Sequence, residues 1–313
     1  MIYTCTITPS IDYTTYLPHF ERGTLNRANE VYYYPGGKGI NVSRVLQQLG
    51  EDSVALGFAG GFTGDYIQQF LQQEGIQTDF ITIDEITRIN VKIKSDVESE
   101  LNGPGPFIHD QQLEALISKV KQLKQGDWFV LAGSLPDLIQ PNFYNRLAHI
   151  CKENGAHFVL ETSGPALKQL TQTKPFLIKP NEHELGELFE VTINSTEQAV
   201  HYAKRLVDDG VEHVIVSLGG DGAILVTKDL IRFAEAPKGQ VVNTVGSGDS
   251  LVSGFLANYM HTKDPVKAFR YGVASGSATA FLPDLCKKKD VEQLVKQVNI
   301  NSLDEGSDPS ENH

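Results

Sequence analysis

Strand-like and helix-like segments alternate along most of this 313-residue chain, and the alternation limits the folds that the chain can adopt. Strands are predicted where β-branched and aromatic residues gather, at 2–8, 54–58, 128–132, 158–160, 176–178, 214–217 and 223–226. Helices are predicted from apolar residues at helical spacing, at 39–49, 65–74, 141–153, 182–189, 196–209 and 265–281. The alternation predicts an α/β fold with a doubly wound, mainly parallel sheet flanked by helices. Ligands of such sheets bind at the carboxyl ends of the strands.

A turn of small residues, Thr244–Gly248, precedes another predicted helix. A glycine turn at a helix start aims backbone N–H groups and the positive end of the helix dipole at a ligand. The amides of Gly246, Ser247 and Gly248 therefore predict an anion site. Asp249 follows directly, and it is either a helix cap or a general base beside that anion site. The pattern by itself favours neither interpretation.

A second glycine cluster, Gly36-Gly37-Lys38-Gly39, precedes the predicted helix that contains Asn41. It is not a Walker-type phosphate loop, because Gly39 stands where Ser or Thr is required and the upstream glycine spacing differs. It is either a plain turn or a place where the two leading glycines let the backbone approach a ligand. The register of Lys38, Asn41 and the helix favours the second interpretation, with both side chains reaching a sugar or its phosphate.

These two segments resemble the two signatures of the ribokinase-like (PfkB-type) carbohydrate kinases, whose second signature ends in a Gly-Ala-Gly-Asp turn. Further segments resemble that family in the same order: Thr8-Pro9-Ser10-Ile11-Asp12, Thr87–Lys92, Ala132–Pro136, Lys179–Leu185 and Ser217–Gly222. The resemblance covers nearly everything except the last dozen residues. Ser247 replaces the family's common Ala, which leaves the backbone donors in place. Glu161 stands where the family pattern has Asp.

The resemblance implies transfer of the γ-phosphoryl group of ATP to a hydroxyl of a ketohexose phosphate. Fructose 1-phosphate, attacked through O6, is the expected substrate, and tagatose 6-phosphate is the alternative. Asp249 is expected to be the base, with the anion hole at Gly246, Ser247 and Gly248. Substrate contacts are expected at Asp12, Gly36, Gly37, Lys38, Asn41, Arg88 and Ser134. ATP contacts are expected at Lys179, Asn181, Glu184, Ser217, Gly219, Gly220, Asp221 and Gly222, and Asn181 and Glu184 are expected to hold Mg²⁺ through water.

Four short strands without intervening helices are predicted at 11–17, 29–34, 88–94 and 97–101. Together with the resemblance, they predict a small β-sheet lid, from about residues 11–35 and 87–102, inserted into a single kinase domain that spans 1–300. A lid excludes water from phosphoryl transfer and limits wasteful ATP hydrolysis. Because an exposed lid sheet can pair with a second copy, a homodimer through the lid is a hypothesis.

Composition narrows the partners. The formal charge is −12, part of which lies in an acidic tail, 301–313, that is predicted to be disordered. The folded part is therefore mildly acidic, which disfavours nucleic acid and anionic membranes as partners. Three scattered cysteines and the lack of a signal or membrane-spanning pattern predict a cytoplasmic protein. An NAD-dependent oxidoreductase is disfavoured because no G-x-G-x-x-G follows the first strand. A non-catalytic sugar-phosphate sensor on the same fold is the alternative from another functional class.

Overall fold

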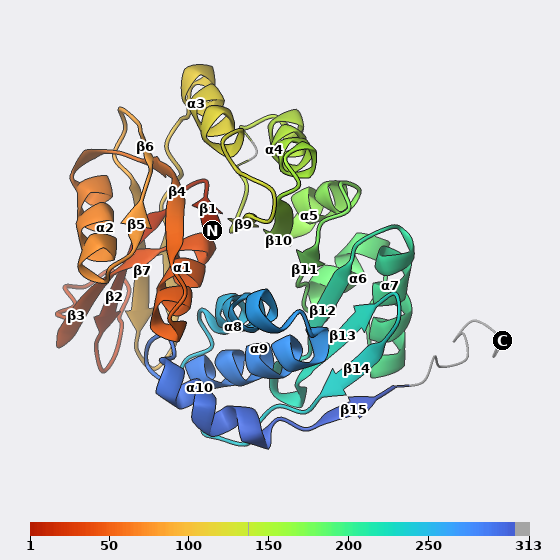
Figure 1. Ribbon diagram of the computed structural model, residues 1–313. Helices are drawn as coiled ribbons and strands as arrows, with labels where there is room; N and C mark the ends of the chain where they lie inside the picture. The colour runs from red at the N-terminus through yellow and green to blue at the C-terminus, as the bar shows by residue number, and fades with distance from the viewer. Residues whose placement is uncertain (137, 304–313) are drawn as a thin grey trace.

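A large and a small β-sheet organise the computed structural model, which describes residues 1–136 and 138–303 (Figure 1). The large sheet has the order β15-β14-β13-β12-β11-β10-β9-β1-β4-β5, and β6 also pairs with β4. Its strands are β1 Ile2–Thr6, β4 Ser53–Ala59, β5 Gln77–Thr78, β6 Ile81–Thr82, β9 Trp128–Ala132, β10 His157–Glu161, β11 Leu177–Ile178, β12 His213–Ser217, β13 Ala223–Thr227, β14 Ile231–Ala234 and β15 Ile300–Ser302.

Strands β12 to β5 of that order pair in parallel, whereas β12 to β15 pair antiparallel. The predicted doubly wound, mainly parallel sheet is thus confirmed, and the structure adds an antiparallel edge that the strand–helix alternation did not predict. Strand β15 also corrects the predicted tail, because residues 301 and 302 pair with β14. The rest of that tail, 304–313, lies outside the described residues.

Helices cover both faces of the large sheet. One face packs against α3 Asp110–Val120, α4 Pro141–Glu153, α5 Gly164–Thr171, α6 Glu182–Phe189 and α7 Thr196–Asp208. The other packs against α1 Lys38–Leu49, α8 Ser247–Thr262, α9 Pro265–Ala280 and α10 Lys288–Leu294. Along β9, Phe129 and Leu131 point into the first layer and Trp128 and Val130 into the second, as the two-residue period of a strand requires. No helix within residues 1–136 and 138–303 combines the length and apolarity that a bilayer span needs.

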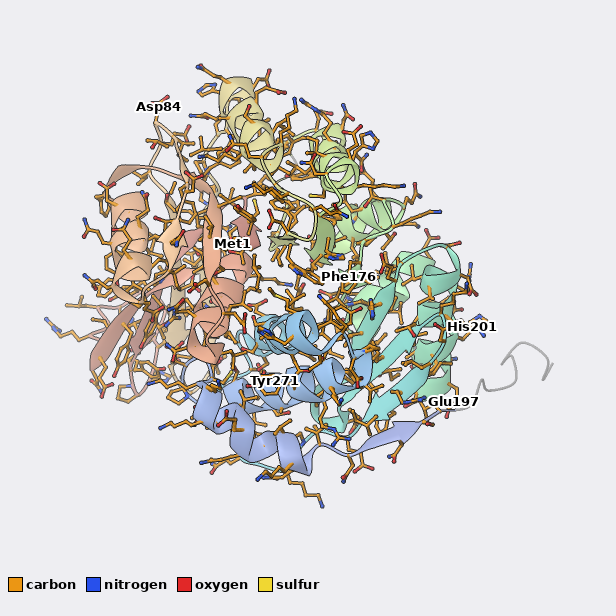
Figure 2. The ribbon with its side chains drawn as sticks, viewed as in Figure 1. Met1, Asp84, Phe176, Glu197, His201 and Tyr271 are labelled. Carbon is orange, nitrogen blue, oxygen red and sulfur yellow. The ribbon has the colours of Figure 1, made fainter. Side chains whose placement is uncertain are left out.

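Side chains fill the space between these layers (Figure 2). Phe176 lies inside the molecule at 4% exposure, whereas Glu197 and His201 of α7 lie on its outer rim. Helix α7 buries Ala199, Ala203 and Leu206 against the sheet, so it has the apolar inner face and polar outer face of a covering helix.

Local sequence signals set several helix bounds. Pro141 begins α4, because its fixed φ suits the first helical position. Gly50 ends α1 in the left-handed region at φ 94°, which glycine adopts without strain. The structure also contains helices that we did not predict, α3, α5 and α10, and two short 3₁₀ turns, Gly219–Asp221 and Val295–Gln297.

The small sheet has the order β3-β2-β7-β8. Its strands are β2 Ser10–Tyr16, β3 Glu30–Gly36, β7 Arg88–Lys94 and β8 Ser99–Asn102, close to the four predicted short strands. Helix α2, Gly61–Gln73, packs between the two sheets, in contact with β2, β3 and β4. The small sheet therefore stands beside the carboxyl end of β1, from which β2 emerges after residues 7–9.

Candidate active site

A cavity of about 960 Å³ opens at the carboxyl ends of the parallel strands. It lies where the large sheet, the small sheet and the start of α8 meet, as expected for a doubly wound sheet. Most of the predicted site residues line it: Asp12, Gly37, Lys38, Asn41, Arg88, Ser134, Lys179, Asn181, Glu184, Ser217, Gly219, Gly220, Gly222, Gly246, Ser247, Gly248 and Asp249. Segments up to about 240 residues apart in sequence thus converge on one site.

Two predicted residues, Gly36 and Asp221, do not line the cavity. A Cβ on Gly36 would lie 2.3 Å from Asp12 Oδ1, so this glycine makes room for a side chain of the protein rather than for a ligand. Asp221 lies on the exposed 3₁₀ turn after β12. The glycines on either side of it still line the cavity.

Asp249 lies on the first turn of α8 and is 4% exposed. The side-chain amide of Asn41, on α1, donates to its Oδ2 atom over 2.8 Å. Burial, followed by the nearby negative charge of Glu161, raises the pKa of Asp249 to about 6, against the opposing effect of the Asn41 hydrogen bond. A carboxylate of this pKa is ionised at neutral pH and is still basic enough to accept a proton.

The turn before Asp249 is held in one conformation. Gly246 has φ 80°, a left-handed conformation that favours glycine. The amide of Ser247 donates to the Thr244 carbonyl over 3.2 Å, which corrects the expectation of three available donors. The amides of Gly246 and Gly248 bond to no carbonyl of the described chain, so these two are left to bind an anion.

Glu161, at the end of β10, is 2% exposed and lies between two lysines. Its Oε1 is 3.3 Å from Lys38 Nζ and 3.3 Å from Lys179 Nζ. Burial raises the pKa of Glu161, but the two ammonium groups outweigh burial and leave that pKa below its usual value. Lys179 Nζ also lies 3.0 Å from where a Cβ on Gly248 would be. The buried carboxylate therefore holds a positive charge beside the anion-binding turn.

Asp12, on β2, has its oxygens bonded by neighbours in the small sheet. Ser10 Oγ and Asn90 Nδ2 donate to Oδ1 over 2.8 and 3.0 Å, and Lys92 Nζ lies 2.8 Å from Oδ2. Asn90 also lines the cavity. The resemblance marked the segment containing Asn90 and Lys92, but we assigned neither residue to the site. The spacing of two residues from Arg88 along β7 could have indicated Asn90 and Lys92, because alternate residues of a strand share a face.

Arg88 begins β7 and is half-buried at the cavity wall. Its terminal nitrogen donates to the Thr8 carbonyl over 3.2 Å. Its buried Nε has no hydrogen-bond partner among the described residues. Burial lowers the pKa of this guanidinium, while Asp12 acts in the opposite direction. An incompletely paired guanidinium at a cavity wall is suited to bind an oxyanion.

Asn181 and Glu184 form a capping box at the start of α6. Asn181 Oδ1 accepts from the Glu184 amide over 2.8 Å, and Glu184 Oε2 accepts from the Asn181 amide over 2.9 Å. Each oxygen so engaged is committed to the helix end. In the described part of the chain no three His, Cys, Asp or Glu side chains gather as a metal cluster. Carboxylate and amide oxygens are the kinds of group that Mg²⁺ contacts in proteins, often through the water ligands that it keeps.

The far end of the cavity includes residues that we did not predict, among them Ala236, Pro237, Gly239, Val241 and Phe281. They are mostly apolar, and they lie beyond the glycine turn Gly219–Gly222 and the start of α8. Apolar lining residues of this kind suit an aromatic base. Helix α9 contributes Val273, Gly276, Ser277 and Ala280 to the lining of the same cavity.

Comparison with known proteins identifies the family of this chain. The family model described as "pfkB family carbohydrate kinase" matches residues 6–288. A 1-phosphofructokinase of Bacillus subtilis is 50% identical over 303 residues, which cover 97% of this chain and 100% of that protein. A D-tagatose-1-phosphate kinase of Bacillus licheniformis is 37% identical over 97% of this chain and 100% of its own length.

Among solved structures, phosphofructokinase-2 from Escherichia coli in complex with fructose 6-phosphate superposes with a TM-score of 0.89. It is 27% identical and covers 95% of this chain and 98% of its own. The segment that the family model matches, residues 6–288, contains both glycine turns, Asp249 and every cavity residue named above. The chain belongs to the pfkB family of carbohydrate kinases.

Proposed function

We propose that the chain transfers the γ-phosphoryl group of ATP to O6 of fructose 1-phosphate and releases fructose 1,6-bisphosphate. The observation that carries this proposal is the 50% identity to the Bacillus subtilis 1-phosphofructokinase along nearly the whole of both chains. The cavity supports it, since one base, one anion-binding turn and several cations face the same space.

In this mechanism Asp249 accepts the proton of the attacking hydroxyl. Asn41 fixes the orientation of the carboxylate through its 2.8 Å hydrogen bond. The amides of Gly246 and Gly248, with Lys179 beside them, stabilise the negative charge of the phosphoryl group during transfer. Because these donors are already in place before the reaction, little reorganisation is needed in the transition state.

The phosphate already present on the sugar binds to Arg88 and Lys38. Arg88 contributes a guanidinium whose Nε is still unpaired, and Lys38 contributes an ammonium whose side chain is 37% exposed. Asp12 accepts hydrogen bonds from the sugar hydroxyls, and Asn41 donates to them. Ser134, two residues after the end of β9, lines the same cavity.

ATP lies over the glycine turn Gly219–Gly222, with its phosphates directed toward α8. The base is expected among the apolar residues at the far end of the cavity. Mg²⁺ would neutralise charge on the phosphates, and the capping box of Asn181 and Glu184 would hold it through water ligands. The small sheet serves as the lid of this site.

A second candidate substrate is tagatose 1-phosphate, which differs from fructose 1-phosphate only in configuration at C4. The Bacillus licheniformis relative supports it. Tagatose 6-phosphate carries its phosphate at the other end, so its acceptor would be O1.

The test is ADP release from ATP·Mg²⁺ with fructose 1-phosphate, tagatose 1-phosphate, tagatose 6-phosphate, fructose 6-phosphate and fructose. We expect the highest kcat/KM with fructose 1-phosphate. Preference for a 6-phosphate would overturn the assigned orientation of the sugar but leave the base in place. Binding without turnover of any of these sugars would favour a non-catalytic sensor.

The small sheet also has a face that can pair with a second copy. Strand β3 is an edge strand, and its Val31, Tyr32 and Tyr33 are 41%, 41% and 51% exposed. Exposed apolar edges of this kind mark association surfaces. We propose a homodimer through this sheet, and a monomeric sedimentation profile at working concentration would exclude it.

A further inference from the structure

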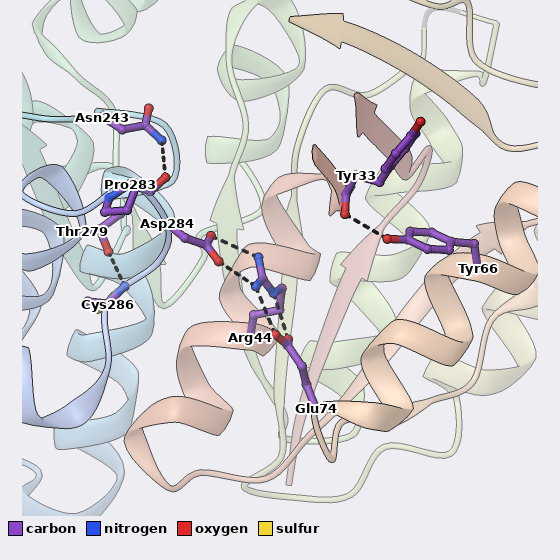
Figure 3. A network of polar contacts seen from close by, with 9 residues as sticks. All are labelled: Tyr33, Arg44, Tyr66, Glu74, Asn243, Thr279, Pro283, Asp284 and Cys286. Carbon is purple, nitrogen blue, oxygen red and sulfur yellow. Dashed lines mark hydrogen bonds and ion pairs between the residues drawn. The ribbon is translucent and has the colours of Figure 1, made fainter. Parts of the chain in front are cut away.

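Arg44, on α1, is a charged residue inside the protein, with a side chain that is only 8% exposed. One edge of its guanidinium forms two hydrogen bonds with Glu74, the residue at the C-cap of α2. Nε donates to Glu74 Oε2 over 2.9 Å, and NH2 donates to Oε1 over 3.1 Å. Figure 3 shows this forked contact at the centre of a polar network.

A second carboxylate, Asp284, binds the neighbouring edge of the same guanidinium, and the two carboxylates share its NH2 group (Figure 3). NH2 donates to Asp284 Oδ2 over 3.1 Å, and NH1 donates to Oδ1 over 3.4 Å. Asp284 belongs to the loop 281–287 between α9 and α10 and is 45% exposed. Arg44 therefore ties a surface loop near the C-terminal end of the fold to two helices near the N-terminal end.

The two neighbours of Asp284 in that loop both contact the turn before Asp249. The Pro283 carbonyl accepts from Asn243 Nδ2 over 3.2 Å (Figure 3). A methyl carbon of Leu285 lies 2.6 Å from where a Cβ on Gly246 would be, so Leu285 packs directly on that glycine. The loop that Arg44 holds is thus the support on which the anion-binding turn lies.

Arg44 also faces the small sheet. Its guanidinium carbon lies 5.9 Å from the ring centre of Tyr34, on β3, and 5.4 Å from that of Phe70, on α2. The hydroxyl of Tyr66 donates to the Tyr33 carbonyl over 2.9 Å and joins α2 to the same strand (Figure 3). One buried cation thus contacts the small sheet, α2 and the support of the anion-binding turn.

We propose that Arg44 is a positioning residue for phosphoryl transfer, which acts through Asp284 to keep the loop 281–287 in contact with Asn243 and with Gly246 of the anion-binding turn, Thr244–Gly248. The inference rests on the proposed role of that turn in holding the transferring phosphoryl group. Arginine is required because only its planar fork binds two carboxylates with two hydrogen bonds each, whereas lysine is a point charge. Displacement of a catalytic donor by about 1 Å can cost about 100-fold in rate.

The test compares two variants that each remove one carboxylate from the same guanidinium. Asp284→Asn removes the charge and one acceptor oxygen from the connection to the turn, and Glu74→Gln is the matched control that weakens the connection to α2 in the same way. We expect Asp284→Asn to lower kcat at least about tenfold and to change both KM values less than about threefold, since the substrate contacts are untouched. We expect Glu74→Gln to lower the melting temperature and leave kcat near the wild-type value. Equal effects of the two variants on kcat would overturn the proposal.

Hydrogen exchange separates this inference from the proposed function, because it needs no turnover. In Asp284→Asn the amides of residues 243–248 should exchange faster than in the wild type, and in Glu74→Gln they should exchange at the wild-type rate. Unchanged exchange in Asp284→Asn refutes the positioning role even if the kinase activity is confirmed. Faster exchange in a protein that phosphorylates no ketohexose phosphate would instead refute the proposed function and retain the mechanical link. Arg44→Lys, which keeps the charge but loses the forked contacts to both carboxylates, should combine the lower kcat and faster exchange of Asp284→Asn with the lower melting temperature of Glu74→Gln.

Discussion

Lowering the pH from 7 to 5 should reduce kcat/KM about tenfold through the ionisation of Asp249 alone. Burial and the charge of Glu161 raise the pKa of Asp249 to about 6, so the carboxylate is about 90% ionised at pH 7 and about 10% ionised at pH 5. Only the ionised form accepts the hydroxyl proton. The profile of kcat/KM reports this group in the free enzyme, and ADP release at saturating ATP measures it.

The phosphate of the sugar itself titrates near pH 6, so its ionisation has to be separated from that of Asp249. The Asp249→Asn variant is the control that does this. The variant should lose about 10²–10⁴ in kcat, the usual contribution of a general base, which corresponds to about 3–5 kcal/mol. Its residual rate should retain the titration of the substrate and lose that of Asp249. A variant that keeps more than about a tenth of the wild-type kcat would refute the assignment of the base. So would wild-type and variant profiles of the same shape.

Three further outcomes are expected. Arg88→Ala should raise KM for the sugar phosphate about 10- to 100-fold, as loss of a charged hydrogen bond implies, with KM for ATP nearly unchanged in the same assay. Glu161→Gln should move the acid limb of kcat/KM to lower pH, because the charge of Glu161 raises the pKa of Asp249. Burial lowers the pKa of His213 to about 4 from the usual 6.5. The stability gained from neutral His213 is therefore complete above pH 6.5 and falls by about 3 kcal/mol as the pH drops to 4. Urea unfolding of His213→Leu, which should lack this dependence, checks that value.

The parallel core was predictable because its strands and helices have strong, separate periodicities. The starts of α4 and α6 are predictable to the residue because Pro141 and the capping box of α6 mark them chemically. Strands β14 and β15 have four and three residues, too few for a period to appear. Strand β14 forms on the edge that β13 offers, and β15 forms on the edge of β14, which is a tertiary cause that no local pattern contains.

The site was predictable where a motif places a residue at a strand or helix end, as for Lys38, Arg88 and Asp249. It was not predictable where a residue acts through partners distant in sequence. Glu161 holds the ammonium group of Lys38, which is 123 residues away in sequence. The family pattern indicates only that Glu161 stands where Asp is usual. Ser247 had its amide assigned to the anion hole, but the bond to the Thr244 carbonyl depends on the φ of Gly246, which the sequence alone does not specify.

If the small sheet closes as the proposed lid, the way in which it joins the rest of the chain would link its movement to the choice of substrate. The chain enters or leaves this sheet at residues 7–9, at Gly37, at 83–87 and at 103–109. The first three of these connections lead directly to Asp12, Lys38 and Arg88, the groups proposed to recognise the sugar phosphate. These connections would be the hinges of the proposed lid. Hinges and a recognition site that share the same short segments cannot vary independently. Relatives that accept a different sugar phosphate should therefore also differ in how readily their small sheet opens and closes.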